Sequence, residues 1–141
     1  MPRYLIVANL TLGGEPLLQV LKERVGQGDA RFHVLAPASH GPQGWRSHDA
    51  EQDAVAAHGR LRDALQQFRD LGADEVTGEM GTSRPVDAVG DVIRANSRDV
   101  FDEIILSTLP AGPSRWLAMD LPTRLARAHK VPVTHVVGPA D

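Results

Sequence analysis

The chain has 141 residues, of which 42% are hydrophobic, and this is enough for one domain with a single buried core. Charged residues make up 23% and the formal net charge is −3, which excludes the broad cationic surface that binding to a nucleic acid backbone needs. Cysteine is absent, which excludes disulfides, thiolate catalysis and sulfur-ligated metals. We therefore expect one domain over residues 1–141 with no nucleic acid partner.

The beginning of the chain does not have the features of a targeting segment. Its apolar run, Tyr4 to Ala8, is too short for a signal peptide and no small-residue cleavage site follows it. No other run approaches the roughly 20 apolar residues of a membrane helix. These features predict a cytoplasmic protein with no membrane contact.

Short apolar runs rich in β-branched residues recur along the chain and predict five strands. The third run is the weakest of them. The five runs are Tyr4 to Ala8, Phe32 to Ala36, Glu75 to Thr77, Ile104 to Leu106 and Val133 to Val137.

Helical spacing of apolar residues separates these runs and predicts four helices. The first follows Pro16, and the second is long, with acidic residues at its start, where the helix dipole favours negative charge, and Gly72 at its end. The apolar positions are Leu17, Leu18, Leu21 and Val25 in the first helix, Ala54, Ala57, Leu61, Leu65 and Phe68 in the second, Val89, Val92 and Ile93 in the third, and Leu121, Leu125 and Ala128 in the fourth. Strands and helices that alternate in this way predict an α/β fold, an open parallel sheet with helices on both faces.

Open parallel sheets bind ligands beyond the carboxyl ends of their strands, where the strand order reverses. The loops expected at this edge are Asn9 to Glu15, Pro37 to Trp45, Gly78 to Pro85 and Ser107 to Ser114. None carries a nucleophile elbow, a Walker-type phosphate loop or a dinucleotide fingerprint, and no base can be assigned to Ser107 or Ser114. The sequence therefore predicts no catalytic residues.

The whole chain, with its five strand–helix units, its long second helix and its ending RLARAHKVPVTHVVG (Arg124 to Gly138), resembles the universal stress protein family. The resemblance implies a Rossmann-like sheet with strand order 3-2-1-4-5, a cleft between the first and fourth strands, and a dimer formed through the last strand. It also implies ATP or AMP as the ligand of those members that bind nucleotides.

Nucleotide-binding members of that family carry a spaced glycine motif that ends in glycine followed by serine or threonine. Aligned on that spacing, this chain has Leu106, Leu109 and Met119 at the glycine positions and Asp120 at the hydroxyl position. Glycine lets backbone N–H groups approach a phosphate without an intervening Cβ, so these side chains crowd that path. We expect the Asp120 carboxylate to cap the helix that begins at Leu121 and so to occupy the N–H groups that a phosphate would use.

Other residues of the expected cleft keep a second interpretation open. Asn9 stands where nucleotide-binding relatives have an aspartate near the adenine, and its amide still donates and accepts hydrogen bonds. The candidate cleft residues are Asn9, Gly13, Gly14, Ser107, Thr108, Gly112, Ser114, Arg115 and Asp120. The leading hypothesis is a non-enzymatic regulatory or interaction module without the usual grip on ATP, so no cofactor is expected. The alternatives are a nucleotide-binding switch or weak ATPase with a rearranged grip, and a sensor of an apolar ligand.

Remaining polar and aromatic residues have structural interpretations. We expect His33 and His135 to be packed or to lie at strand ends, His40 and His48 to flank a surface loop without binding metal, and Trp45 and Trp116 to act as packing anchors. The last predicted strand, Val133 to Val137, begins after Pro132 and is apolar, as an edge strand would be. An apolar edge invites pairing with a second copy, which predicts a homodimer.

Overall fold

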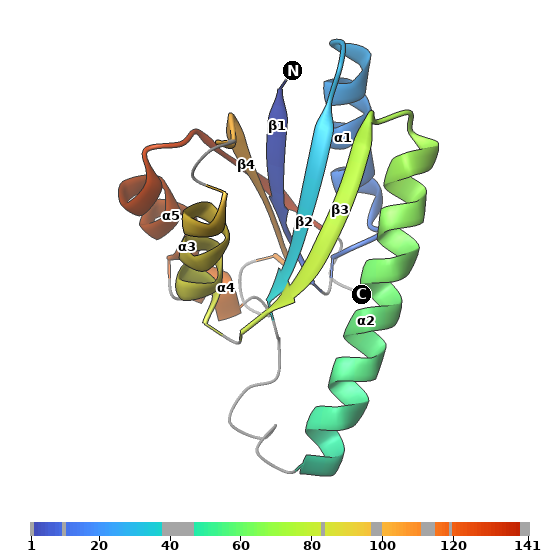
Figure 1. Cartoon of the computed structure of the whole chain (residues 1–141). Coiled ribbons are helices and arrows are strands. Elements are labelled where there is room, and N and C mark those ends of the chain that lie inside the picture. Colours follow the sequence, from blue (N-terminus) through green and yellow to red (C-terminus); the bar gives the residue numbers. More distant parts are fainter. Residues whose placement is uncertain are drawn as a thin grey trace.

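The computed structural model describes residues 2–9, 11–37, 47–82, 84–96, 100–110, 115–118 and 120–138, and within these it does not describe the side chains of 47–54, 115 and 118. Strands and helices alternate along the chain (Figure 1). In order they are β1 (Arg3–Val7), α1 (Glu15–Gly26), β2 (Arg31–Pro37), α2 (Ser47–Asp70), β3 (Glu75–Gly81), α3 (Pro85–Ala95), β4 (Glu103–Thr108), α4 (Arg115–Ala118), α5 (Leu121–His129) and β5 (Val133–Val137).

The strands form one parallel sheet in the order β3-β2-β1-β4-β5, which confirms the predicted α/β architecture and strand order. The order reverses between β1 and β4, so this is the switch point. β3 and β4 extend beyond the predicted runs, and residues 78–81 and 107–108 therefore belong to strands and not to loops. Ser107 and Thr108 consequently end a rigid element at the switch point.

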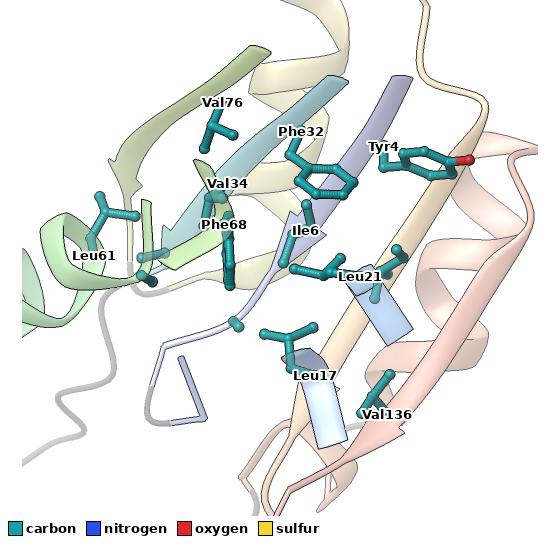
Figure 2. Packing of buried hydrophobic residues seen from close by; sticks show 14 of the residues in the cluster. Tyr4, Ile6, Leu17, Leu21, Phe32, Val34, Leu61, Phe68, Val76 and Val136 are labelled. Carbon is teal, nitrogen blue, oxygen red and sulfur yellow. The ribbon is translucent and has the colours of Figure 1, made fainter. Parts of the chain in front are cut away.

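One face of the sheet is covered by α1 and α2. Leu17 and Leu21 of α1 and Phe68 of α2 are buried against alternate residues of β1 and β2. The Phe32 ring lies between Tyr4 and Phe68, with ring centroids 5.7 Å and 6.4 Å away (Figure 2). These aromatic contacts fix the long second helix to the centre of the sheet.

The opposite face is covered by α3 and α5 (Figure 1). Its core is made by the other set of alternate strand residues, including Leu5, Val7 and Leu35, with Val89 of α3 and Leu125 of α5. The three inner strands β1, β2 and β4 are thus buried on both faces, as expected for a parallel sheet between two layers of helices.

Three details differ from or refine the predicted helices. Gly72 follows α2 with φ +101°, a conformation that favours glycine, and so ends the helix as predicted. The short helix α4 was not predicted, because four residues are too few for a helical pattern. Ala128 is exposed at the end of α5, so its predicted place on the apolar face of that helix was wrong.

No helix in the described part of the chain is long and apolar enough to cross a membrane.

An ion pair fastens α1 to the amino-terminal edge of the sheet. Arg24 Nε and Nη2 each donate to the Glu103 carboxylate at 2.9 Å, and Thr134 also donates to it. Both charged side chains are mostly buried, with 17% and 16% exposed. The hydrogen bond from Arg24 is the main reason that the pKa of Glu103 is lowered from its ordinary value of 4.5. The charged form of Glu103 therefore stabilises the fold.

Glu103→Gln is expected to lower the free energy of unfolding by about 1–2 kcal/mol at neutral pH, because it removes the charge but keeps one acceptor. The pKa of Glu103 is lower in the folded chain, so this contribution is present above the unfolded pKa and is lost as the pH falls through the folded pKa. Urea unfolding of both proteins from neutral to acid pH measures the difference.

Glu23→Gln is the matched control. Glu23 also lies 4.0 Å from Arg24, but its side chain is 71% exposed. Glu23→Gln should lower the free energy of unfolding by less than about 0.5 kcal/mol. Equal losses for the two variants, or a Glu103 effect that persists in acid, would refute the role given to this pair.

Candidate functional site

The buried polar side chains of the described residues all gather at the carboxyl ends of β1 and β4. They are Asn9, Thr11, Ser107 and Thr108, and none is more than 5% exposed. This is the switch point of the sheet, where α/β proteins bind ligands. We call these four residues the switch-point cluster and take the place where they meet as the candidate site.

A hydrogen bond between two hydroxyls joins the loop after β1 to the end of β4. Thr11 Oγ1, in the loop after β1, lies 2.6 Å from Ser107 Oγ near the end of β4. Gly138 packs on the other side of Thr11: a Cβ at that glycine would lie 2.8 Å from Thr11 Cγ2. The Gly138 N–H also donates to the Thr108 carbonyl at 2.7 Å. The loop after β1 is therefore held against the ends of β4 and β5.

Thr108 is paired on both sides. Its hydroxyl donates to the Leu109 carbonyl at 2.8 Å and lies 2.8 Å from His135 Nε2. A hydroxyl has a single proton, so while it donates to Leu109 it accepts from the imidazole N–H. His135 is exposed in the middle of β5, so it is neither packed nor at a strand end as predicted. The pair ties β5 to the end of β4.

Asn9 uses both ends of its amide within the protein. Its Nδ2 donates to the Pro37 carbonyl at the end of β2, at 2.6 Å. Its Oδ1 accepts from Arg60 Nη2 of α2 at 2.8 Å. An aspartate here would place an oxygen against the Pro37 carbonyl, so the amide is the side chain that satisfies both partners.

The predicted cap by Asp120 is wrong. Asp120 precedes α5 with φ 57° and ψ 43°, is exposed, and makes no side-chain hydrogen bond to the helix. A capping side chain needs an extended backbone at that position to face the first N–H groups, and the left-handed conformation does not provide it. Asp120 acts through its backbone: its N–H donates to Leu117 and its carbonyl accepts from Arg124.

The other predicted site residues are only partly brought together. Gly13, with φ +83°, and Gly14, which precedes α1, form the turn after β1 with Thr11. Gly112 and Ser114, like His40 and Trp45, lie outside the described residues, and only the backbone of Arg115 and His48 is described. Trp116 packs against the core beside α3 and α5, in line with its predicted role as an anchor.

His33 is packed in the sheet, as predicted. His33 is half-buried on β2, with Nδ1 2.6 Å from Thr77 Oγ1 and Nε2 2.7 Å from Glu79 Oε2. Within the described ranges, no three histidine or carboxylate side chains gather in a way that could hold a metal ion.

Sequence reasoning missed Thr11 and Arg60. Thr11 lies in the predicted loop Asn9 to Glu15, but nothing in that loop singles it out. Arg60 had a signal: it falls three residues after Ala57 and four before Ala64, which are both buried, so helical spacing directs it to the sheet.

Removing the hydroxyl pair should destabilise the fold in a non-additive way. Thr11→Val and Ser107→Ala should each cost about 1–3 kcal/mol, because each leaves the other hydroxyl buried without its partner. The double variant should cost less than the sum, with a coupling of about 1 kcal/mol. Urea unfolding of the four proteins measures the cycle.

Thr123→Val serves as the control, because Thr123 is only half-buried, on α5, away from the pair. It should change stability by less than about 0.5 kcal/mol. Strictly additive losses at Thr11 and Ser107 would contradict the pairing.

Comparison with known proteins supports the fold. No family model matches the chain. No curated protein matches it. Among solved structures, a universal stress protein family protein from Arabidopsis thaliana with AMP bound is 13% identical, with 100% of this chain and 94% of that chain covered and a TM-score of 0.63.

Two further solved structures agree. The universal stress protein from Archaeoglobus fulgidus in complex with dAMP is 18% identical over 96% of this chain and 97% of that one, with a TM-score of 0.59. A universal stress protein in complex with cAMP is 17% identical over 96% of both chains, with a TM-score of 0.59. The chain therefore has the fold of the universal stress proteins.

Proposed function

We propose that the protein is a cytoplasmic regulatory or interaction module of the universal stress protein type that does not hold ATP in the manner of its nucleotide-binding relatives. The observation that carries the proposal is the switch-point cluster. All four of its side chains are buried and hydrogen-bonded within the protein. A nucleotide between β1 and β4 would have to replace these bonds with its own.

The amide at Asn9 supports the same proposal. Its oxygen accepts from Arg60 and one amide proton is donated to Pro37, so one amide proton and one lone pair of the oxygen are left for a base. Of the three residues at the glycine positions of the family motif, Leu106 is buried in the core with α3 and α5, and Met119 lies outside the described residues. Leu109 alone supports the proposal, because a Cβ restricts the approach of a phosphate to the backbone. Asp120 does not support the proposal, because its side chain does not cap α5.

A second candidate is a nucleotide-binding switch or weak ATPase. It is favoured by the solved structures with AMP, dAMP or cAMP bound and by the failure of Asp120 to occupy the first turn of α5. Such a grip would be built from Gly13, Gly14, Gly112, Ser114 and Arg115.

Calorimetric titration of the protein with ATP and with AMP tests the choice. The proposal expects no micromolar binding of either nucleotide, because the polar groups at the switch point are already paired. Micromolar binding that Arg115→Ala weakens about tenfold would establish the second candidate instead. ATP hydrolysis above the buffer rate, abolished by the same substitution, would identify it as an enzyme.

We also propose a homodimer formed through β5. This strand pairs only with β4 in the described chain and leaves its other edge open. Val137 at its end is 46% exposed. Pairing of two copies would cover that edge and the apolar side chains beside it.

Val137→Lys should shift the protein from dimer to monomer in sedimentation equilibrium, because it would replace an apolar side chain of the proposed interface by a charged one. Val55→Lys, at a 73% exposed position on α2, is the control and should leave the dimer intact. A monomeric unaltered protein would disprove the dimer, whereas dimers of unchanged stability in Val137→Lys would place the interface elsewhere.

A further inference from the structure

Arg60 is a half-buried cation at the carboxyl edge of the sheet. It lies on α2, and its Nη2 reaches Asn9 at the end of β1. Asn9 in turn reaches Pro37 at the end of β2. The guanidinium is thus held beside the ends of β1 and β2, next to the switch-point cluster. This is the edge of a parallel sheet where ligands bind.

The positive charge of Arg60 meets no carboxylate among the described residues. Its hydrogen-bond partner there is a neutral amide, and its Nε is buried without an acceptor. An arginine fork has five N–H donors, and the hydrogen bond to Asn9 uses one of them among the described residues. A partly buried cation with a buried unpaired donor is destabilising until an anion reaches it.

Arg24 is a comparable arginine of this chain that is paired with a carboxylate. It is mostly buried and gives two hydrogen bonds to the Glu103 carboxylate. Arg60 has no such partner among the described residues, and its acceptor at the end of β1 is the neutral amide of Asn9. A positive charge therefore lies at the ends of β1 and β2, and no carboxylate among the described residues pairs with it.

We propose that Arg60, held in place by Asn9, binds an oxyanion, the phosphate or carboxylate group of a small molecule. Guanidinium forks match the geometry of both groups and bind them through charge-assisted hydrogen bonds. The proposal goes beyond the regulatory role and does not require it, because it concerns one anionic group at the ends of β1 and β2. A nucleotide bound between β1 and β4 would be a separate event.

The test is thermal unfolding of the full chain with increasing inorganic phosphate at constant ionic strength, repeated with acetate as a carboxylate. Phosphate stabilises proteins in general by exclusion from their surface, so the informative quantity is the difference between variants. Specific binding raises the unfolding midpoint along a saturating curve, which gives an apparent Kd.

Three variants isolate Arg60. Arg60→Gln removes the cation and should weaken the apparent Kd by about tenfold or more. Ala56→Glu places a carboxylate one helical turn before Arg60 at an exposed position, and should weaken binding similarly while the fold is kept. Arg62→Gln removes an exposed arginine from the same helix and should change the Kd by less than about twofold.

The site is supported if the unfolding midpoint rises along a saturating curve in the unaltered chain and in Arg62→Gln, and if this rise is lost in Arg60→Gln and Ala56→Glu. The anion that gives it identifies the group as phosphate or carboxylate. Equal rises in all four proteins, or none in any, would overturn the proposal. ATP binding that survives Arg60→Gln would contradict the regulatory proposal and leave this result unaffected, so the two failures are distinguishable.

Discussion

The structure depends on how polar groups are paired where β1 and β4 end. Parallel strands bring their carboxyl ends to one edge, and at the switch point no strand crossover covers that edge. A buried hydroxyl or amide without a partner there would cost about 1–3 kcal/mol. This chain meets the requirement from within: Thr11 bonds to Ser107, Thr108 to His135, and Asn9 to Pro37 and Arg60. The same pairs join β1, β2, β4, β5 and α2.

This pairing bears on which ligands can bind where β1 and β4 end. In solved structures with the same fold, AMP, dAMP or cAMP is bound, whereas this chain supplies its own partners at the switch point. These internal bonds connect the ends of β1, β2, β4 and β5. Arg60 is the exception, because its charge is met only by an amide among the described residues. We therefore propose that a single anionic group, and not a whole nucleotide, binds at this edge.

The fold could be predicted from the sequence because strand runs and helical spacing are local patterns. The strand order 3-2-1-4-5 came from the family resemblance and is confirmed. The site was less accessible, since its bonds join residues far apart in the chain, such as Thr11 and Ser107, and no spacing encodes them. The cap by Asp120 failed for another reason: residue type and position suggested it, but the left-handed backbone decides where the side chain points.

The central claim is that the four side chains of the switch-point cluster are hydrogen-bonded within the protein, so that a nucleotide between β1 and β4 would have to displace these bonds. A crystal structure grown with AMP in large excess tests it most directly. We predict that Thr11 Oγ1 and Ser107 Oγ stay within hydrogen-bonding distance and that no nucleotide lies between β1 and β4. Density for AMP at that place, with the two hydroxyls parted and bonded to the ligand, would contradict the account.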